Sequence, residues 1–226
     1  MKDKKKFIYQ IKQKIKEKIR VDGIENLSNI LDSFKSEYLN GIKNFGISDP
    51  EQSWKPFKGN FLEEIILESI INEINKLGLL AIKGSELERQ EGSLNECYAK
   101  AKRSIVVDYG KYGMHLPDAD LIIINPKDDC KVVAIISSKT TLRERIAQTG
   151  YWCLKLRQGR CTKNVKTFFI TLDEDGDFTQ SFPAKKGRAI AEKDTDGTFI
   201  ITNKPIEESS TVKKFKDFLI ELKKIV

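Results

Sequence analysis

Two short apolar runs separated by a polar turn constrain the fold of this chain more than any other feature. The runs are Leu121–Ile124 and Val132–Ile136, and each is apolar at every position. Successive side chains of a strand point to opposite faces, so a strand without polar positions must be covered on both faces. The turn at residues 125–129 reads Asn-Pro-Lys-Asp-Asp. The pattern predicts two antiparallel central strands with helices on both sides, an α/β architecture.

Hydrophobic periodicity predicts the remaining elements around this pair. Apolar residues at helical spacing predict helices over about 3–20, 25–44, 60–76 (with Asn60 as N-cap), 141–158 and 208–225. Runs rich in β-branched residues predict strands over about 79–83, 103–108, 119–125, 131–138, 166–172 and 197–202. We therefore expect a central mixed β-sheet flanked by helices. Residues 1–50 would form an N-terminal helical region, and residues 51–226 the main domain.

The net charge of +7 is concentrated in one part of the chain. Residues 1–20 contain nine lysines or arginines against two acidic residues, and the rest of the chain is neutral as a whole. Within that remainder, residues 139–166 hold eight basic residues and one acid, Glu144. Two basic segments on an otherwise neutral chain favour a polyanionic partner, although a lysine-rich helix is also a common solvated exterior.

Cysteine, histidine and hydropathy patterns exclude several classes of protein. The chain has four cysteines, none in a CxxC pair, and one histidine, His115. A structural zinc site needs four such ligands at close spacing, which this chain lacks, so any metal would be held by oxygen atoms, as magnesium or calcium is. No apolar run approaches the roughly 20 residues of a membrane span, and the N-terminus lacks the apolar region of a secretory signal. We expect a cytoplasmic protein with no membrane partner and with reduced cysteines.

Acidic and basic residues flank the central strand pair at one end. Asp118 and Asp120 precede the first run, and Ser137 and Lys139 end the second. Strand alternation predicts that the two aspartates share a face, and an antiparallel turn brings an aspartate close to Lys139. A carboxylate can hold a divalent cation, and a lysine can stabilise the charge that develops on a phosphate. Aspartate–lysine pairs at this spacing are common, so the pair alone identifies no function.

The residues after Lys139 add a more specific pattern. They read Thr-Thr-Leu-Arg-Glu-Arg, which places an Arg-Glu-Arg triplet in the first turn of the next predicted helix. Together with Ser137-Ser138-Lys139, this resembles the PD-(D/E)xK nucleases. More narrowly, it resembles the type II restriction endonucleases that recognise CCGG or CC-N-GG cores, which carry Ser-x-Lys followed by Arg-(Asp/Glu)-Arg. The resemblance covers about 59–158 and is strong over 117–152.

This resemblance implies a catalytic pair and a metal site. Asp118 and Lys139 match the family's catalytic aspartate and lysine, and Asp120 could take the place of Asp118 if both lie on one strand face. The cofactor implied is Mg²⁺. Its ligands would be Asp118 or Asp120, a glutamate from an upstream helix, and the backbone carbonyl at Ser138.

The upstream glutamate has three candidates. Glu63 matches the family's position best, with Glu64 and Glu68 as alternatives, although an exposed helix face would also explain all three. The chain departs from the family at one place. Several relatives carry a second glutamate downstream of the lysine, where this chain has Trp152 and Cys153. The resemblance therefore leaves open whether one or two metal ions bind.

The Arg-Glu-Arg triplet predicts the recognition chemistry. Arg143 and Arg145 can each donate two hydrogen bonds to a guanine, and Glu144 can accept from cytosine N4. The resemblance implies a restriction-modification hydrolase that cuts double-stranded DNA at a palindrome containing a CCGG-like core. A homodimer would cut both strands. Two other interpretations remain at this point: a structure-specific or repair nuclease of the same fold, and a non-catalytic DNA-binding protein.

Overall fold

The predicted central strands form and pair as expected. The computed structural model describes residues 2–142 and 145–225. Strand β4 (Leu121–Asn125) pairs antiparallel with β5 (Lys131–Lys139), with Leu121 opposite Ile136. On the other side of β4 lies β1 (Leu80–Lys83), also antiparallel. Beyond β5, the sheet continues in parallel with β6 (Lys166–Thr171), β7 (Gly197–Ile200) and β8 (Val212–Lys214). The sheet is therefore mixed, in the order β1-β4-β5-β6-β7-β8.

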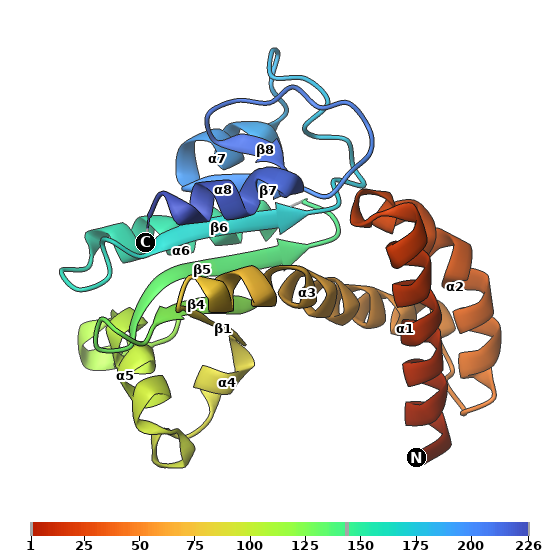
Figure 1. Ribbon diagram of the computed structural model, residues 1–226, viewed down its shortest axis with the longest axis horizontal. Coiled ribbons are helices and arrows are strands. Elements are labelled where there is room, and N and C mark those ends of the chain that lie inside the picture. The colour runs from red at the N-terminus through yellow and green to blue at the C-terminus, as the bar shows by residue number, and fades with distance from the viewer. Residues whose placement is uncertain (1, 143–144, 226) are drawn as a thin grey trace.

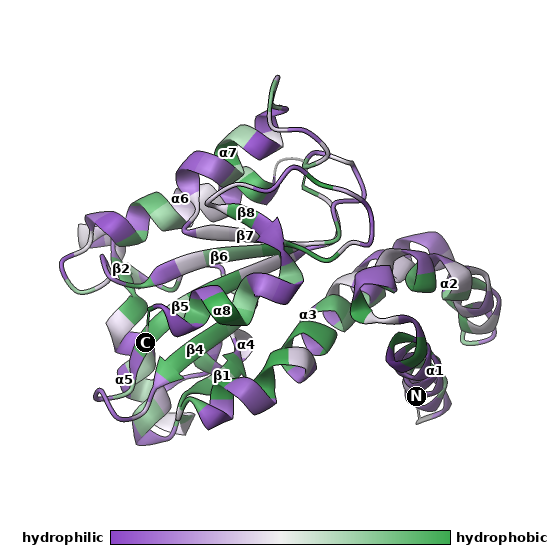
Figure 2. Cartoon of the chain, turned by 45° about the horizontal axis from the view of Figure 1, so that its top comes forward, coloured by the Kyte–Doolittle hydropathy of each residue, from purple (hydrophilic) through white to green (hydrophobic). Residues whose placement is uncertain are grey.

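Helices cover both faces of this sheet, as the apolar strands require (Figures 1 and 2). One face packs on α3 (Pro50–Lys76) and α8 (Phe218–Lys223). The other packs on α5 (Glu96–Ile105), α6 (Arg145–Gln158) and α7 (Lys186–Asp194), with the short α4 (Ser85–Glu88) nearby. In β4, Leu121 and Ile123 are buried on the α3 side, whereas Ile122 and Ile124 are buried on the opposite side. The predicted α/β fold is confirmed.

The N-terminal helices pack on the start of α3, beyond the edge of the sheet (Figure 1). Helix α1 (Lys2–Asp22) contributes the buried Ile11 and Ile15, and α2 (Leu27–Lys43) follows a turn of 3₁₀ helix at Ile24–Asn26. Their apolar residues belong to the same core cluster as α3 and one face of the sheet. The basic N-terminal helix is thus a packing element, and the division of the chain at residue 50 stays a prediction.

Helix α3 begins earlier than the sequence pattern predicted. The Asp49 side chain accepts a hydrogen bond from Gln52 N at 2.9 Å, and Pro50 occupies the first turn. Trp54 and Phe57 in the added turns are buried against Tyr38 of α2. The prediction of Asn60 as N-cap is wrong, because the aromatic contacts to α2 extend the helix toward its N-terminus.

Three further elements differ from expectation. The segment 103–108 is mostly the end of α5, and only Val107–Asp108 form a strand (β2), paired with β3 (Met114–His115). Helix α7 was not predicted. The expected closing helix is reduced to α8, because Val212–Lys214 pair with β7 and a 3₁₀ turn at Phe215–Asp217 follows. In the last case a long-range strand pairing overrides local helical periodicity.

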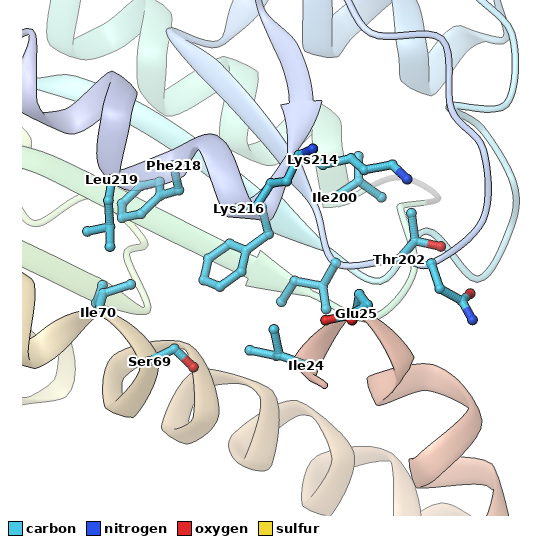
Figure 3. Close-up of a pocket in the computed structure, with 13 residues that line it drawn as sticks. Ile24, Glu25, Ser69, Ile70, Ile200, Thr202, Lys214, Lys216, Phe218 and Leu219 are labelled. Atoms are coloured by element: carbon cyan, nitrogen blue, oxygen red, sulfur yellow. The ribbon is translucent and has the colours of Figure 1, made fainter. Parts of the chain in front are cut away.

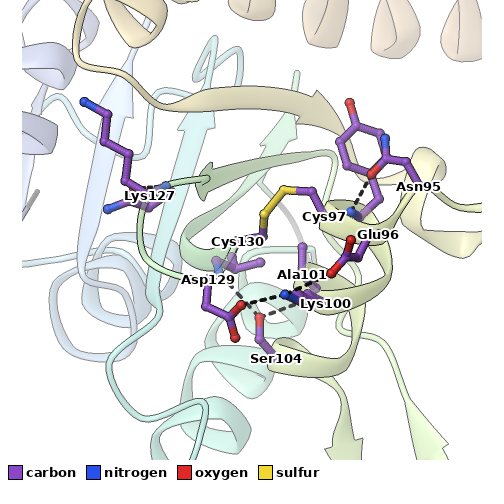
Figure 4. The surroundings of a disulfide bond; sticks show 12 residues. Asn95, Glu96, Cys97, Lys100, Ala101, Ser104, Lys127, Asp129 and Cys130 are labelled. Atoms are coloured by element: carbon purple, nitrogen blue, oxygen red, sulfur yellow. Dashed lines mark hydrogen bonds and ion pairs between the residues drawn. A yellow bond between two sulfur atoms is a disulfide. The ribbon is translucent and has the colours of Figure 1, made fainter.

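Helix α5 also explains an error about the cysteines. It places Cys97 against the β4–β5 turn, where Cys97 and Cys130 form a disulfide with a Cα–Cα distance of 5.3 Å (Figure 4). The prediction of reduced cysteines is wrong for this pair, because the approach between helix and turn is a long-range contact that no local pattern encodes. Among the described residues, Cys153 and Cys161 are free thiols. No helix within those residues is long and apolar enough to cross a membrane.

Candidate active site

The strand pair brings Asp120 and Lys139 together at one end of the sheet. Asp120 N donates to Ile136 O at 2.9 Å, which fixes Asp120 directly before β4, and Lys139 is the last residue of β5. Lys139 Nζ lies 2.9 Å from Asp120 Oδ2 and 3.2 Å from Oδ1. Their side chains are only 16% and 13% exposed. Ser138 N donates to Asp120 Oδ2 at 2.5 Å, so an ammonium and a backbone amide hold the carboxylate.

Asp118 makes a different contact. It is exposed and accepts a hydrogen bond from Gln148 Nε2 of α6 at 2.8 Å. Residues 116–120 lie outside the sheet, so strand alternation does not govern where their side chains point. The structure therefore pairs Lys139 with Asp120, the alternative, and not with Asp118.

The three helix glutamates of α3 separate into two groups. Lys16 Nζ of α1 lies 2.6 Å from Glu64 and 2.5 Å from Glu68, and Lys12 also bonds Glu64. Burial acts to raise the pKa of Glu64, but hydrogen bonds from Lys12 and Lys16 outweigh it and lower the pKa below its usual value. These two glutamates fasten α1 to α3, so Glu63 is the candidate that these ion pairs do not engage.

The charges of Asp120 and Lys139 influence the Glu63 carboxyl. Burial raises the pKa of the Glu63 carboxyl above its usual value, and the negative charge of Asp120 raises it further. Lys83 and Lys139 act in the opposite direction, and Asp118 contributes a smaller upward effect. Of the neighbouring glutamates Glu63 and Glu64 of α3, Glu63 is thus the one whose pKa responds to the charges of Asp120 and Lys139.

The donor set around this cluster fits a divalent cation. Glu63 and Asp120 offer carboxylate oxygens. The backbone carbonyl of the buried Ser138, next to Lys139 on β5, offers a further oxygen. The negative charge of Asp120 raises the pKa of Glu63, and a bound cation would stabilise the charged form of both carboxyl groups. Within residues 2–142 and 145–225, no three histidine, cysteine or acidic side chains form a ready-made metal cluster. Such a cation would take its other ligands from water and phosphate, as Mg²⁺ usually does.

The position of the family's second glutamate supplies no carboxylate here. Cys153 is buried on α6, and its Sγ lies 3.6 Å from Asp196 Oδ2. Burial, followed by the charge of Asp196, raises the pKa of the Cys153 thiol to about 11, so it is a neutral packing group.

Only part of the Arg-Glu-Arg triplet can be placed. Arg143 and Glu144 lie outside the described residues. Arg145 is the exposed first residue of α6, and its N donates to Leu142 O at 2.9 Å. Arg145 is therefore the one residue of the triplet whose position the structure describes.

A large cavity lies away from these residues. It measures about 570 Å³ and is lined mainly by apolar side chains of α3, α8 and the end of β7, including Ile70, Phe218 and Leu219 (Figure 3). None of the site residues lines it. The candidate site residues described above therefore lie outside this cavity.

Comparison with known proteins identifies the family. The sequence model of the BsaWI restriction endonuclease type 2 family matches residues 97–223. MjaVIP of Methanocaldococcus jannaschii, which bears the name of a type II restriction enzyme, is 31% identical over 206 residues, covering 85% of this chain and 89% of that protein. The chain belongs to the type II restriction endonucleases. It is an enzyme of this class, as the Ser-x-Lys and Arg-Glu-Arg pattern predicted.

One further relative agrees with this assignment, and one solved structure shares the fold. HpyAORF263P of Helicobacter pylori, also named as a type II restriction enzyme, is 36% identical over 124 residues, covering 54% of this chain and 61% of that protein. The structure of the restriction endonuclease PspGI with its substrate DNA has a TM-score of 0.56 at 13% identity, covering 96% of this chain and 92% of that one. This last likeness confirms the fold.

The neighbouring glutamates of α3 provide a matched pair of variants. Glu63→Gln should lower the rate of DNA cleavage on the order of 10²-fold, because it removes a charge from the site. Glu64→Gln should leave the rate unchanged and lower the free energy of unfolding by under about 1 kcal/mol, since its partly exposed ion pairs are screened. Because the folded pKa of Glu64 is lowered, that stabilisation is present at neutral pH and is lost on acidification. Cleavage assays and urea unfolding measure both; loss of cleavage in Glu64→Gln alone would reverse the assignment.

Proposed function

We propose that this protein is a Mg²⁺-dependent endonuclease that cuts double-stranded DNA at a palindromic site with a CCGG-like core. The observation that carries the proposal is the Asp120–Lys139 contact at 2.9 Å. The charges of both residues also act on the Glu63 carboxyl. An enzyme that hydrolyses phosphodiesters needs carboxylates for a cation and a positive group for the phosphate at the same place. The family assignment supports hydrolysis as the reaction.

Each residue of the site has a distinct part in this mechanism. A bound Mg²⁺ would neutralise the phosphate and activate a water. Glu63 and Asp120 would hold the ion, together with the carbonyl at Ser138. The Ser138 amide fixes the Asp120 carboxylate, and Lys139 Nζ supplies positive charge where negative charge develops on the phosphate. Asp118, bonded to Gln148, would shape the approach of α6 to the site.

The exposed side of α6, which contacts Asp118 through Gln148, suits duplex DNA. Helix α6 carries Arg145, Lys155 and Arg157 and no acidic residue. Lys155 Nζ lies 5.3 Å from the ring centre of Tyr109 and 5.7 Å from that of the exposed Tyr151. Cationic and aromatic groups along an exposed helix that begins near the candidate site favour a nucleic acid partner. The DNA in the PspGI structure, an enzyme of similar fold, supports the same partner.

Sequence recognition is assigned to the Arg-Glu-Arg triplet. Arg143 and Arg145 would bond guanines, and Glu144 would accept from cytosine in the major groove. A single chain offers one such site, so a homodimer with two-fold symmetry is the simplest arrangement for cutting both strands of a palindrome. The basic helix α1 would contribute through its exposed Lys5, Lys6 and Arg20, which can contact phosphates without reading sequence.

Incubation with plasmid DNA and Mg²⁺ tests this function. We expect discrete fragments whose sequenced ends share paired C and G positions. Arg145→Ala should lose about 1–3 kcal/mol of discrimination per guanine contact and still bind DNA weakly at low salt. A smear of products would indicate cleavage without recognition. Intact plasmid under all divalent cations would reject the proposal.

A further inference from the structure

Lys83 lies beside the proposed active site, although no sequence motif indicated it. It is the last residue of β1 and stands opposite Leu121, the residue after Asp120. Gly84 N donates to Asp120 O at 2.9 Å. A Cβ atom on Gly84 would lie 1.7 Å from Ala119 O, so only glycine allows this approach. The end of β1 is therefore fastened directly to the segment that presents Asp120.

The Lys83 side chain faces the helix that carries Glu63. Ala81 of the same strand is buried in the core on the α3 side, and strand alternation puts Lys83 on that face. Burial and Asp120 raise the pKa of Glu63, and Lys83 is the strongest of the charges that lower it, ahead of Lys139. Lys83 of β1 and Lys139 of β5 thus both act to lower the pKa of Glu63.

Lys83 has no partner of its own within the described chain. It is half-buried, yet it forms neither a hydrogen bond nor an ion pair with any residue that the structure describes. Some half-buried lysines are paired, such as Lys58, whose Nζ lies 2.7 Å from Glu174, and Lys213, whose Nζ lies 2.6 Å from Glu221. Lys214, like Lys83, is half-buried and has no side-chain partner within the described chain. Holding a partly desolvated ammonium without a contact is unfavourable, so the position suits a group that binds an incoming anion.

The net charge of the site also favours a role for Lys83 in binding an anion. The charges of Asp118, Asp120, Lys83 and Lys139 all act on the Glu63 carboxyl, so the set as a whole holds three carboxylates and two ammonium groups. One divalent cation and one phosphate diester would bring this set to neutrality. Without Lys83 the set would keep an excess negative charge, which would oppose the binding of an anionic substrate.

We propose that the Lys83 ammonium donates a hydrogen bond to an oxygen of the phosphate that is cut, from the β1 side, while Lys139 acts from the β5 side. The inference rests on the proposed function, because it requires DNA cleavage at this cluster. It adds to the Asp, Glu and Lys of the motif a second lysine supplied by the edge strand of the sheet.

Three variants test this role. Lys83→Met removes the charge and keeps the length of the side chain, Lys83→Arg keeps the charge, and Lys127→Met removes an exposed charge at the opposite end of β4 as a control. Single-turnover cleavage is measured with a plasmid fragment that the wild type cuts, at saturating protein and Mg²⁺. Binding to the same fragment is measured in Ca²⁺ across a range of salt concentrations.

Lys83→Met should slow cleavage on the order of 10²-fold and lower the slope of log affinity against log salt by about 0.9, the value for one lost phosphate contact. Lys83→Arg should keep most of the rate, and Lys127→Met should match the wild type. A wild-type rate and salt slope for Lys83→Met would overturn the inference, as would an equal loss in Lys83→Arg. If Lys83→Met fails to fold, Lys83→Gln serves in its place.

The same assays separate this inference from the proposed function. If the wild type cuts no DNA, or if Lys139→Met cuts normally, the proposed function itself fails. If Lys139→Met is inactive and Lys83→Met behaves as the wild type, only the role of Lys83 is rejected.

Discussion

Asp120→Asn is expected to reduce the rate of DNA cleavage by about 10³-fold or more, and Lys139→Met by a similar factor. The asparagine keeps the shape of the side chain and still accepts a hydrogen bond from Ser138 N, but it loses the charge that would hold a cation. Lys139→Met removes the ammonium that lies 2.9 Å from Asp120. Each change acts on charge that matters most in the transition state, so the effect falls on the cleavage step.

Asp118→Asn is the matched control for Asp120→Asn. Asp118 lies two positions earlier, is exposed and bonds Gln148, so its variant should stay within about tenfold of the wild-type rate. Binding to a DNA fragment in Ca²⁺, followed by fluorescence polarisation, should be retained by all three variants. If Asp118→Asn were inactive in cleavage and Asp120→Asn active, the catalytic aspartate would be Asp118 and not Asp120.

The location of the site could be predicted from sequence because its determinants are local. Two apolar runs and a polar turn define an antiparallel pair, and such a pair necessarily places the start of one strand beside the end of the next. The meeting of an aspartate with Lys139 follows from this. The strand pairing does not predict whether Asp118 or Asp120 contacts Lys139. Both aspartates lie on a segment outside the sheet, and the backbone path of that segment decides between them.

Contacts between distant segments determine which other residues belong to the candidate site. Glu63 was the best match among three glutamates, but what removes Glu64 and Glu68 from the site is their pairing with Lys12 and Lys16 of α1. Lys83 enters the site through the pairing of β1 with β4. No motif contains these relationships, since each joins residues from separate elements whose packing the local sequence does not encode.

Reducing the Cys97–Cys130 disulfide should destabilise the protein strongly and leave its chemistry unchanged. The bridge closes a loop with a sequence separation of 33. Loop entropy predicts a loss of about 3–4 kcal/mol in the free energy of unfolding. For a chain of this size that corresponds to a fall in Tm of roughly 7–15 °C. Thermal unfolding with and without a reductant measures the shift.

The reduced protein should still fold, because other contacts hold α5 to the turn (Figure 4). Lys100 Nζ lies 2.8 Å from Asp129, and Val132 N donates to Ser104 Oγ at 3.4 Å. Since the turn lies at the opposite end of the β4–β5 pair from Asp120, the cleavage rate of the reduced protein below its Tm should stay within about threefold of the oxidised rate. Cys97→Ser should unfold at the lower temperature whether or not reductant is present. An equal Tm for oxidised, reduced and Cys97→Ser protein would contradict a stabilising bridge.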